Sequence, residues 1–143
     1  MKVLFDTNVV LDLLLDRAPF SEASARVLSR VEAGELVGYL CATTVTTIHY
    51  LASKPLGAQR AIAEVRKLLA LFEIAPVNRP ILENALDSGF SDFEDSVLHA
   101  AACLVGAEAI VTRNESDFSR SEIPVYSPEE MIQILRQRPR DHG

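Results

Sequence analysis

The sequence predicts an α/β fold in which helices are layered on a parallel sheet. Short apolar, β-rich runs alternate along the chain with longer segments whose apolar residues recur every three or four positions. This alternation is typical of strands joined by helical crossovers, which make the strands parallel. With 143 residues, 48% of them hydrophobic, the chain is long enough for one domain with a sizeable core. We therefore expect a single domain over residues 1–135.

The first two strand–helix units are indicated by changes in the spacing of apolar residues. Lys2–Phe5 is an apolar run with β-branched content, which suits a buried strand, and the nearly continuous apolar residues of Val9–Leu15 suit a buried helix. Residues 19–35 carry apolar side chains at helical spacing and include Gly34, a common residue at helix ends. A second β-rich run follows at residues 36–43.

The middle of the chain is expected to be mostly helical. Residues 43–53 keep their apolar positions on a helical period, and the sequence KPLG at 54–57 is expected to break this helix. An amphipathic helix over 58–72, a strand candidate at 73–77 and a short helix at 79–86 complete this part.

Capping signals mark the helices of the C-terminal third. Ser91, with Glu94 three residues later, predicts a capping box for a helix that ends near Gly106. Ser127, followed by proline and Glu130, predicts a second capping box for a last helix. Strands are expected at residues 109–112 and 123–126. The final residues, 136–143, are polar and contain proline, so we expect a flexible tail.

Composition and charge restrict the classes of function. The formal net charge of -6 means that the surface as a whole repels nucleic acid, so such a role requires a metal ion or a local basic patch. Cys41 and Cys103 lie in apolar stretches and are expected to be buried free thiols without partners for a zinc site. No apolar run approaches the ~20 residues of a membrane span, and the N-terminus lacks a signal-peptide cleavage pattern, so we expect a cytoplasmic protein with no membrane partner.

Acidic and amide side chains are predicted to meet at the carboxyl ends of the strands. The candidates are Asp6 after the first strand, Asp92, Glu94 and Asp95 at the start of a late helix, and Thr112, Asn114 and Asp117 after the next strand. A right-handed crossover places that helix start and these strand ends at one crevice. Carboxylates gathered there repel one another unless a divalent cation is present, and oxygen ligands suit Mg²⁺ or Mn²⁺. We therefore expect metal-assisted attack of water on a phosphodiester.

Several of these residues have simpler interpretations. Asp6 alone could be a helix N-cap, the capping box would account for Glu94, and Asp117 could be a turn acid. Asp12 is expected to be solvated or paired with Arg17. The available phosphate partners are Arg17, Lys54, Arg60, Arg113, Arg136, Arg138 and Arg140, each of which could equally be a solvated surface charge.

Four blocks of the sequence resemble the PIN-domain family, in particular the VapC-like bacterial toxin ribonucleases. They read LFDTNVVLDLLLDR near the start, TTVTTIHYL in the middle, SDFEDSVLHAAACLVGAEAIVTRNESDF later, and IPVYSPEE near the end. The resemblance implies a three-layer α/β/α sandwich with a central parallel sheet of four to five strands. It also implies a Mg²⁺- or Mn²⁺-dependent endoribonuclease, a homodimer and, in many members, an antitoxin partner.

The resemblance also assigns roles to individual residues. The catalytic residues it implies are Asp6, Asn8, Asp95 and Asp117, and the metal ligands are Asp6, Asp95 and Asp117, with Asp92 as a further candidate. The expected substrate contacts are Thr44, Thr112, Arg113 and Asn114. The family usually carries a second acid on its middle helix, where this chain has His49 and Tyr50. Either Asp92 or Glu94 replaces that acid, or metal binding is weaker than in typical members.

The leading hypothesis is thus an endoribonuclease that acts as the toxin of a type II toxin-antitoxin pair. The alternative is a PIN-like module that binds RNA or protein through a degenerate site, which the absent second acid and the acidic surface favour. A phosphoacceptor receiver domain that uses Asp6 ranks low, because it requires a lysine near the end and no lysine follows Lys67.

Overall fold

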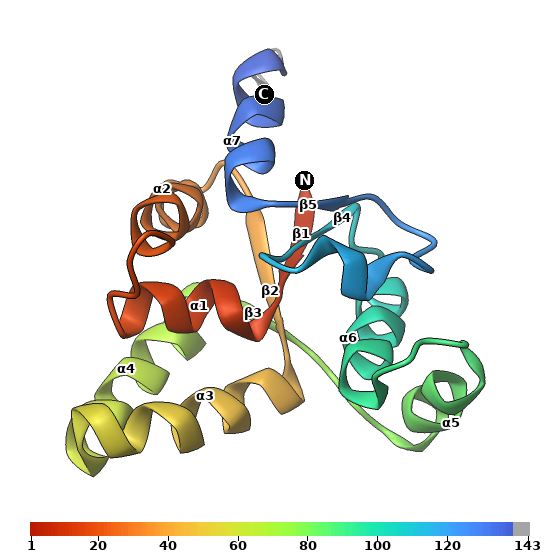
Figure 1. The fold of residues 1–143 in the computed structure, drawn as a ribbon, viewed down its shortest axis with the longest axis horizontal. Helices are drawn as coiled ribbons and strands as arrows, with labels where there is room; N and C mark the ends of the chain where they lie inside the picture. Colours follow the sequence, from red (N-terminus) through yellow and green to blue (C-terminus); the bar gives the residue numbers. More distant parts are fainter. Residues whose placement is uncertain (139–143) are drawn as a thin grey trace.

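The computed structural model describes residues 1–138 and has the expected α/β architecture (Figure 1). Its five strands are β1 (Lys2–Phe5), β2 (Val37–Cys41), β3 (Glu73–Ala75), β4 (Ala109–Val111) and β5 (Val125–Tyr126). They form one sheet in the order β3-β2-β1-β4-β5, and every pairing is parallel. The chain moves outward from β1 to β3 and then resumes beside β1 with β4. The strand order therefore reverses between β1 and β4.

Helices cover both faces of this sheet. They are α1 (Thr7–Leu14), α2 (Ser21–Glu32), α3 (Ala42–Leu56), α4 (Ala58–Leu71), α5 (Arg79–Asp87), α6 (Phe93–Leu104) and α7 (Pro128–Gln137), with a 3₁₀ turn, η1 (Glu115–Phe118). Figure 1 shows α1 to α4 on one side of the strands, α5 and α6 on the other, and α7 at the apex of a triangular outline. The predicted three-layer sandwich is thus confirmed.

The central strands explain the two layers. Val3 and Phe5 are fully buried in a cluster with side chains of α1, α2, α3, α4 and α7, whereas Leu4 is fully buried against α5 and α6. In β4, Val111 and Ile110 divide in the same way between the two clusters. Successive side chains of a strand point to opposite faces, so a continuous apolar run supplies both cores.

The break predicted at residues 54–57 is shorter in the structure. Helix α3 continues through Lys54 and Pro55 and ends at Leu56. Pro55 lies in the last turn, where a missing N–H removes one hydrogen bond but leaves the preceding turns intact. Gly57, with a φ of 86°, separates α3 from α4, because glycine adopts this backbone conformation without steric cost.

Two capping predictions have different outcomes. At α7 the capping box is confirmed: the Ser127 hydroxyl accepts from the Glu130 N–H, and the Glu130 carboxylate accepts from the Ser127 N–H. At α6 the box of Ser91 and Glu94 is wrong. The helix begins one residue later, and the Asp92 carboxylate accepts from the Asp95 N–H at 2.9 Å. Glu94 is therefore not used as a cap.

Two further expectations change at the surface. Cys41 is buried as expected, but Cys103 is exposed on the last turn of α6, beside Leu104, which is 56% exposed. Helix α7 ends at Gln137, so the first two residues of the predicted tail are helical, and residues 139–143 lie outside the described part. Within residues 1–138, no helix is both long enough and apolar enough to cross a membrane.

Candidate metal centre

Asp6 lies at the point where the strand order reverses. Phe5 of β1 pairs with Val111 of β4, which brings the next residues, Asp6 and Thr112, side by side. The Asp6 carboxylate accepts from the Thr112 hydroxyl at 2.8 Å and from the Thr7 N–H at 2.7 Å. The second bond makes Asp6 the N-cap of α1. The cap and the candidate ligand are thus the same buried carboxylate, held from two elements.

Asn8 connects the same two strand ends from the first turn of α1. Its amide nitrogen donates to the Asp6 carboxylate at 3.3 Å, and its amide oxygen accepts from the Arg113 N–H at 3.3 Å. Because one side of the amide must donate and the other accept, these two bonds fix its orientation.

Further carboxylates approach Asp6 from α6 and η1. Asp95 lies half-buried in the first turn of α6, Glu94 is exposed beside it, and Asp117 is exposed on η1. We call Asp6, Glu94, Asp95 and Asp117 the acidic cluster. The charges of these acids act on one another: Asp6 and Asp117 both raise the pKa of Asp95, and Asp117 also raises that of Asp6.

Two acids of the cluster, Asp95 and Asp6, have a raised pKa. Burial raises the pKa of Asp95 to about 7, and the charges of Asp6, Asp92, Asp117 and Glu94 add to the shift. Burial also raises the pKa of Asp6, although the hydrogen bonds from Thr112 and Thr7 oppose that shift. Burial thus destabilises the charged form of both carboxylates, and at Asp6 two hydrogen bonds offset part of this effect.

The donor chemistry of the cluster fits a hard divalent cation. Its members offer only carboxylate oxygens, with the Asn8 amide beside them. Within residues 1–138, none of the salt bridges of the chain joins a lysine or arginine to a cluster acid. In residues 1–138, however, no three His, Cys, Asp or Glu side chains are arranged so that they could hold a metal ion, so the acids of the cluster would have to move together around a cation. Mg²⁺ and Mn²⁺ suit such a site because they keep several water ligands.

Two predicted substrate contacts are corrected by burial. Thr44 is fully buried, and its hydroxyl accepts from the Thr7 hydroxyl at 3.1 Å, so it connects α3 to α1. Thr112 is also fully buried; its hydroxyl donates to Asp6 and accepts from the Asn114 N–H at 3.1 Å. Neither side chain has surface left for a substrate, and Thr112 instead positions Asp6. Asn114 itself is exposed at the start of η1.

Asp12 has a role that sequence reasoning missed. It is 1% exposed, and its carboxylate accepts two hydrogen bonds from the Arg113 guanidinium, at 2.8 and 3.2 Å. The expected ion pair of Asp12 with Arg17 is confirmed at the longer distance of 3.7 Å, and the solvated alternative is wrong. The only signal in the sequence was the position of Asp12 inside an apolar run, which indicates burial and hence the need for a cationic partner.

The missing acid of the middle helix has a candidate substitute. His49 and Tyr50 are both exposed on α3, and Tyr50 is 78% exposed. The carboxylate of Asp92 caps α6 and acts through its charge on Asp95, whereas the charge of Glu94 acts on both Asp6 and Asp95. Of the two, only Glu94 raises the pKa of Asp6 through its charge, whereas at Asp95 the charge of Asp92 has the larger effect.

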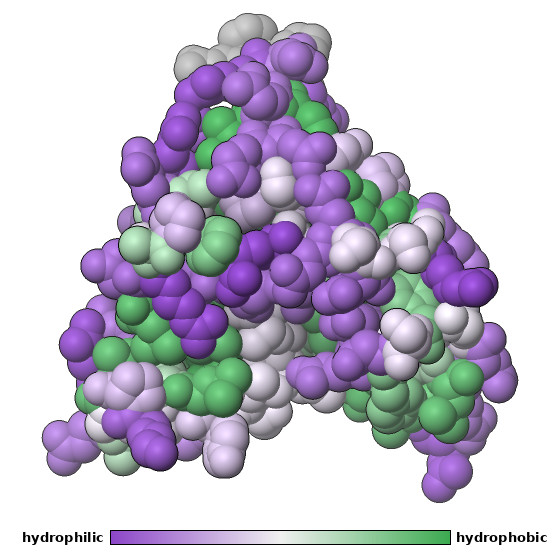
Figure 2. All heavy atoms as spheres, in the orientation of Figure 1, coloured by the Kyte–Doolittle hydropathy of each residue, from purple (hydrophilic) through white to green (hydrophobic). Residues whose placement is uncertain are grey.

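The surroundings of the strand ends are polar. On the face seen in Figure 2, hydrophilic side chains gather over the middle of the molecule, where Figure 1 shows β1 and β4 ending. More hydrophobic regions lie to either side, over α3 with α4 and over α5. A charged substrate would therefore meet its polar contacts at the centre of this face.

Comparisons with known proteins agree with this geometry. The profile of the PIN domain matches residues 2–116. Ribonuclease VapC1 of Aquifex aeolicus (strain VF5) is 25% identical over 137 residues, which cover 92% of this chain and 94% of that protein. A chain of a toxin-antitoxin complex from Klebsiella pneumoniae is 28% identical with a TM-score of 0.67, over 88% of this chain and 97% of that chain. FitAcB from Neisseria gonorrhoeae, 22% identical, shares the fold with a TM-score of 0.68, over 89% of this chain and 98% of that chain.

Proposed function

Because this chain belongs to the PIN-domain family, we propose that it is an endoribonuclease that hydrolyses RNA phosphodiester bonds with Mg²⁺ or Mn²⁺. The observation that carries the proposal is the convergence of Asp6, Asp95 and Asp117 without a cationic partner in the described residues. A ribonuclease relative that aligns over nearly the whole chain supports the choice of substrate.

The residues of the metal centre have different roles in the proposed reaction. Asp6, Asp95 and Asp117 would hold it, with Glu94 or Asp92 as an additional oxygen donor. When bound, the ion supplies an activated water and stabilises charge on the phosphate. Thr7 and Thr112 keep the Asp6 carboxylate in one orientation. Asp95, whose pKa is about 7 without a cation, holds a proton near neutral pH and can release it when a cation approaches.

We also propose that the protein is the toxin of a type II toxin-antitoxin pair, works in the cytoplasm and forms a homodimer. The solved structures that it resembles include a toxin-antitoxin complex in which the matching chain is 28% identical. The sparse basic residues add a reason for the dimer, because two copies would bring two sets of arginines to one RNA.

The test is cleavage by the purified protein of structured and single-stranded RNA with Mg²⁺, with Mn²⁺ or with EDTA. We expect cleavage with metal, its loss in EDTA, and at least a hundredfold slower cleavage by Asp6→Asn, because the buried ligand loses its charge. Cleavage that survives both changes would exclude the metal mechanism.

A second candidate function has its own observation. The family acid of the middle helix is absent, and His49 and Tyr50 stand on exposed positions of α3 instead. A degenerate site would bind RNA or a protein partner without turnover. Titration calorimetry with Mn²⁺ separates the two functions, since the degenerate site predicts no metal binding.

A further inference from the structure

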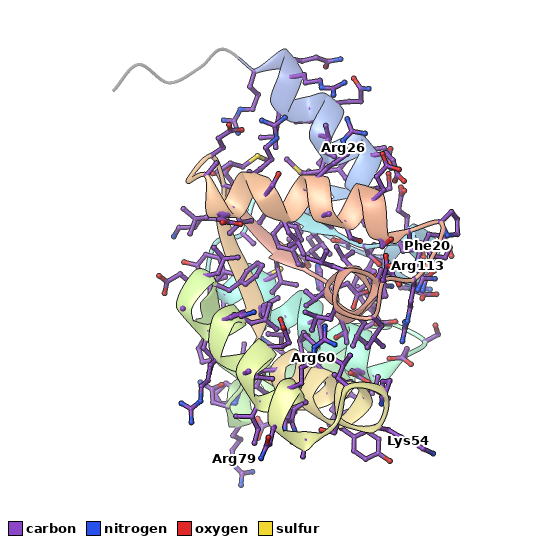
Figure 3. The ribbon with its side chains drawn as sticks, turned by 90° about the vertical axis from the view of Figure 1, so that its left-hand side faces the viewer. Phe20, Arg26, Lys54, Arg60, Arg79 and Arg113 are labelled. Atoms are coloured by element: carbon purple, nitrogen blue, oxygen red, sulfur yellow. The ribbon has the colours of Figure 1, made fainter. Side chains whose placement is uncertain are left out.

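We propose that Arg113, held by Asp12 and stacked on Phe20, is a subsite that binds an RNA backbone phosphate next to the scissile one. The proposal rests on the nuclease function proposed above and adds a binding residue and two positioning residues to it. Figure 3 shows Phe20 and Arg113 together at one edge of the molecule, whereas Arg79 and Lys54 lie far from them.

The guanidinium group is fixed on two sides. Its Nε and Nη2 atoms donate to the Asp12 carboxylate at 2.8 and 3.2 Å, and its central carbon lies 4.2 Å from the centre of the Phe20 ring. The Asp12 carboxylate is almost completely buried, and a buried charge without a partner is strongly destabilised, so the ion pair with Arg113 stays closed. The arginine therefore loses little conformational freedom when it meets a ligand.

One edge of the group is left for a ligand. Within residues 1–138, the Nη1 atom of Arg113 donates no hydrogen bond, and its side chain remains 28% exposed. Arg17 joins the same carboxylate at 3.7 Å and is 40% exposed. Two arginines and one aspartate leave a net charge of +1, which suits an anion such as a phosphate diester.

The position of this charge matters in an acidic protein. The chain carries a net charge of -6, and the acidic cluster itself repels RNA until a cation is bound. Arg113 directly follows Thr112, the residue that donates to Asp6, and its N–H donates to Asn8. The backbone of Arg113 thus adjoins the metal centre, and its guanidinium reaches from there to Asp12 on the second turn of α1, where a neighbouring phosphate of a bound strand would lie.

The experiment compares Arg113→Gln with Arg79→Gln, which removes the same charge from an arginine that is 87% exposed on α5 and that, among the described residues, pairs with Glu83 alone. Steady-state kinetics use whichever RNA the wild-type protein cleaves fastest. We expect KM to rise about tenfold for Arg113→Gln with kcat little changed, as for loss of one charge-assisted hydrogen bond. The salt slope of RNA affinity should become shallower by about 0.7, the value for one phosphate contact on a single strand. Arg79→Gln should change neither quantity.

The positioning role of Phe20 is tested by Phe20→Leu. We expect KM to rise about threefold, because the guanidinium keeps its charge but is no longer fixed by the ring. Mn²⁺ affinity, measured by calorimetry, should stay unchanged in Phe20→Leu and Arg113→Gln.

The outcomes separate the two proposals. If wild-type protein cleaves RNA but Arg113→Gln leaves KM and the salt slope unchanged, the subsite is excluded and the nuclease function stands. A loss of Mn²⁺ affinity at constant KM would also exclude the subsite, because the ion pair would then only tie the loop after β4 to α1. Failure of the wild-type protein to cleave any RNA would overturn both.

Discussion

Among the residues of the metal centre, Asp6 accepts one hydrogen bond from a hydroxyl, that of Thr112. Its carboxylate is 8% exposed, and burial raises its pKa while the Thr112 hydroxyl, at 2.8 Å, lowers it. Thr112→Val keeps the shape of the side chain and removes this hydrogen bond. The carboxylate should then prefer its protonated form, and Mn²⁺ binding should weaken about tenfold, the range found for residues that orient metal ligands. Titration calorimetry measures the change.

Two further variants control this prediction. Thr112→Ser retains the hydroxyl and should bind Mn²⁺ as the wild type does. Thr46→Val removes a hydroxyl that donates to the Thr43 carbonyl on α3, away from the acidic cluster, so it should leave metal affinity unchanged. If Thr112→Val binds Mn²⁺ normally, the hydroxyl does not act through Asp6.

A residue in the core of α2 offers a stabilising substitution. The Ser24 hydroxyl is, within residues 1–138, the one buried side-chain polar atom without a hydrogen-bond partner. Ser24→Ala removes that unsatisfied group and raises helix propensity, so the free energy of unfolding should increase by about 1 kcal/mol. Urea denaturation measures it. A decrease would mean that the hydroxyl has a partner in solution, such as a buried water.

At the scale of elements, the start of α6 decides which acid joins the cluster. Asp92 caps the helix through the Asp95 N–H, and asparagine caps equally well. Glu94 interacts with both Asp6 and Asp95 and has no capping role. Glu94→Gln should therefore weaken Mn²⁺ binding and slow RNA cleavage about tenfold, whereas Asp92→Asn should change both by less than about threefold.

Glu94→Gln and Asp92→Asn are matched variants, because each removes one negative charge from the start of α6. Calorimetry and cleavage rates with the same RNA allow the comparison. Equal effects of the two variants would mean that Mn²⁺ binding depends only on the total negative charge at the start of α6. A larger effect of Asp92→Asn would make Asp92 the replacement for the absent family acid.

Most elements could be predicted from the sequence because their signals are local. Apolar spacing gives the type of each element, and the cap of α7 lies within four residues, so the prediction at Ser127 and Glu130 was correct. The start of α6 was misplaced because Ser91 and Asp92 are both good caps and their order in the sequence does not decide between them. In the structure the later residue, Asp92, forms the cap.

The candidate site was predictable only in outline. Parallel strands end at one edge, so Asp6 and the residues after β4 had to approach one another. The pairing of Asp12 with Arg113 joins residues 101 positions apart and has no local signal. Thr44 and Thr112 looked like surface hydroxyls for the same reason, since burial depends on how α3 and β4 pack, which periodicity does not give.

For the whole molecule, the acidic cluster predicts how stability changes with pH. In the unfolded chain Asp95 titrates near its ordinary pKa of 3.8, whereas in the fold its pKa is about 7. Between these values the native state binds more protons than the unfolded state, so its stability falls as pH rises and reaches its lower level above pH 7. The raised pKa of Asp6 acts in the same direction. His99 acts oppositely, because burial lowers its pKa.

The metal-free wild-type protein should therefore lose several degrees in Tm, relative to Asp95→Asn, between pH 5 and pH 8. Subtracting the variant cancels the contribution of His99, which both proteins share. A bound cation neutralises the repulsion, so excess Mn²⁺ should raise the Tm of the wild type more at pH 8 than at pH 5. Differential scanning calorimetry in EDTA and in Mn²⁺ measures both effects. Parallel pH profiles for the two proteins in EDTA would show that neither burial nor the neighbouring acids raise the pKa of Asp95 in the fold.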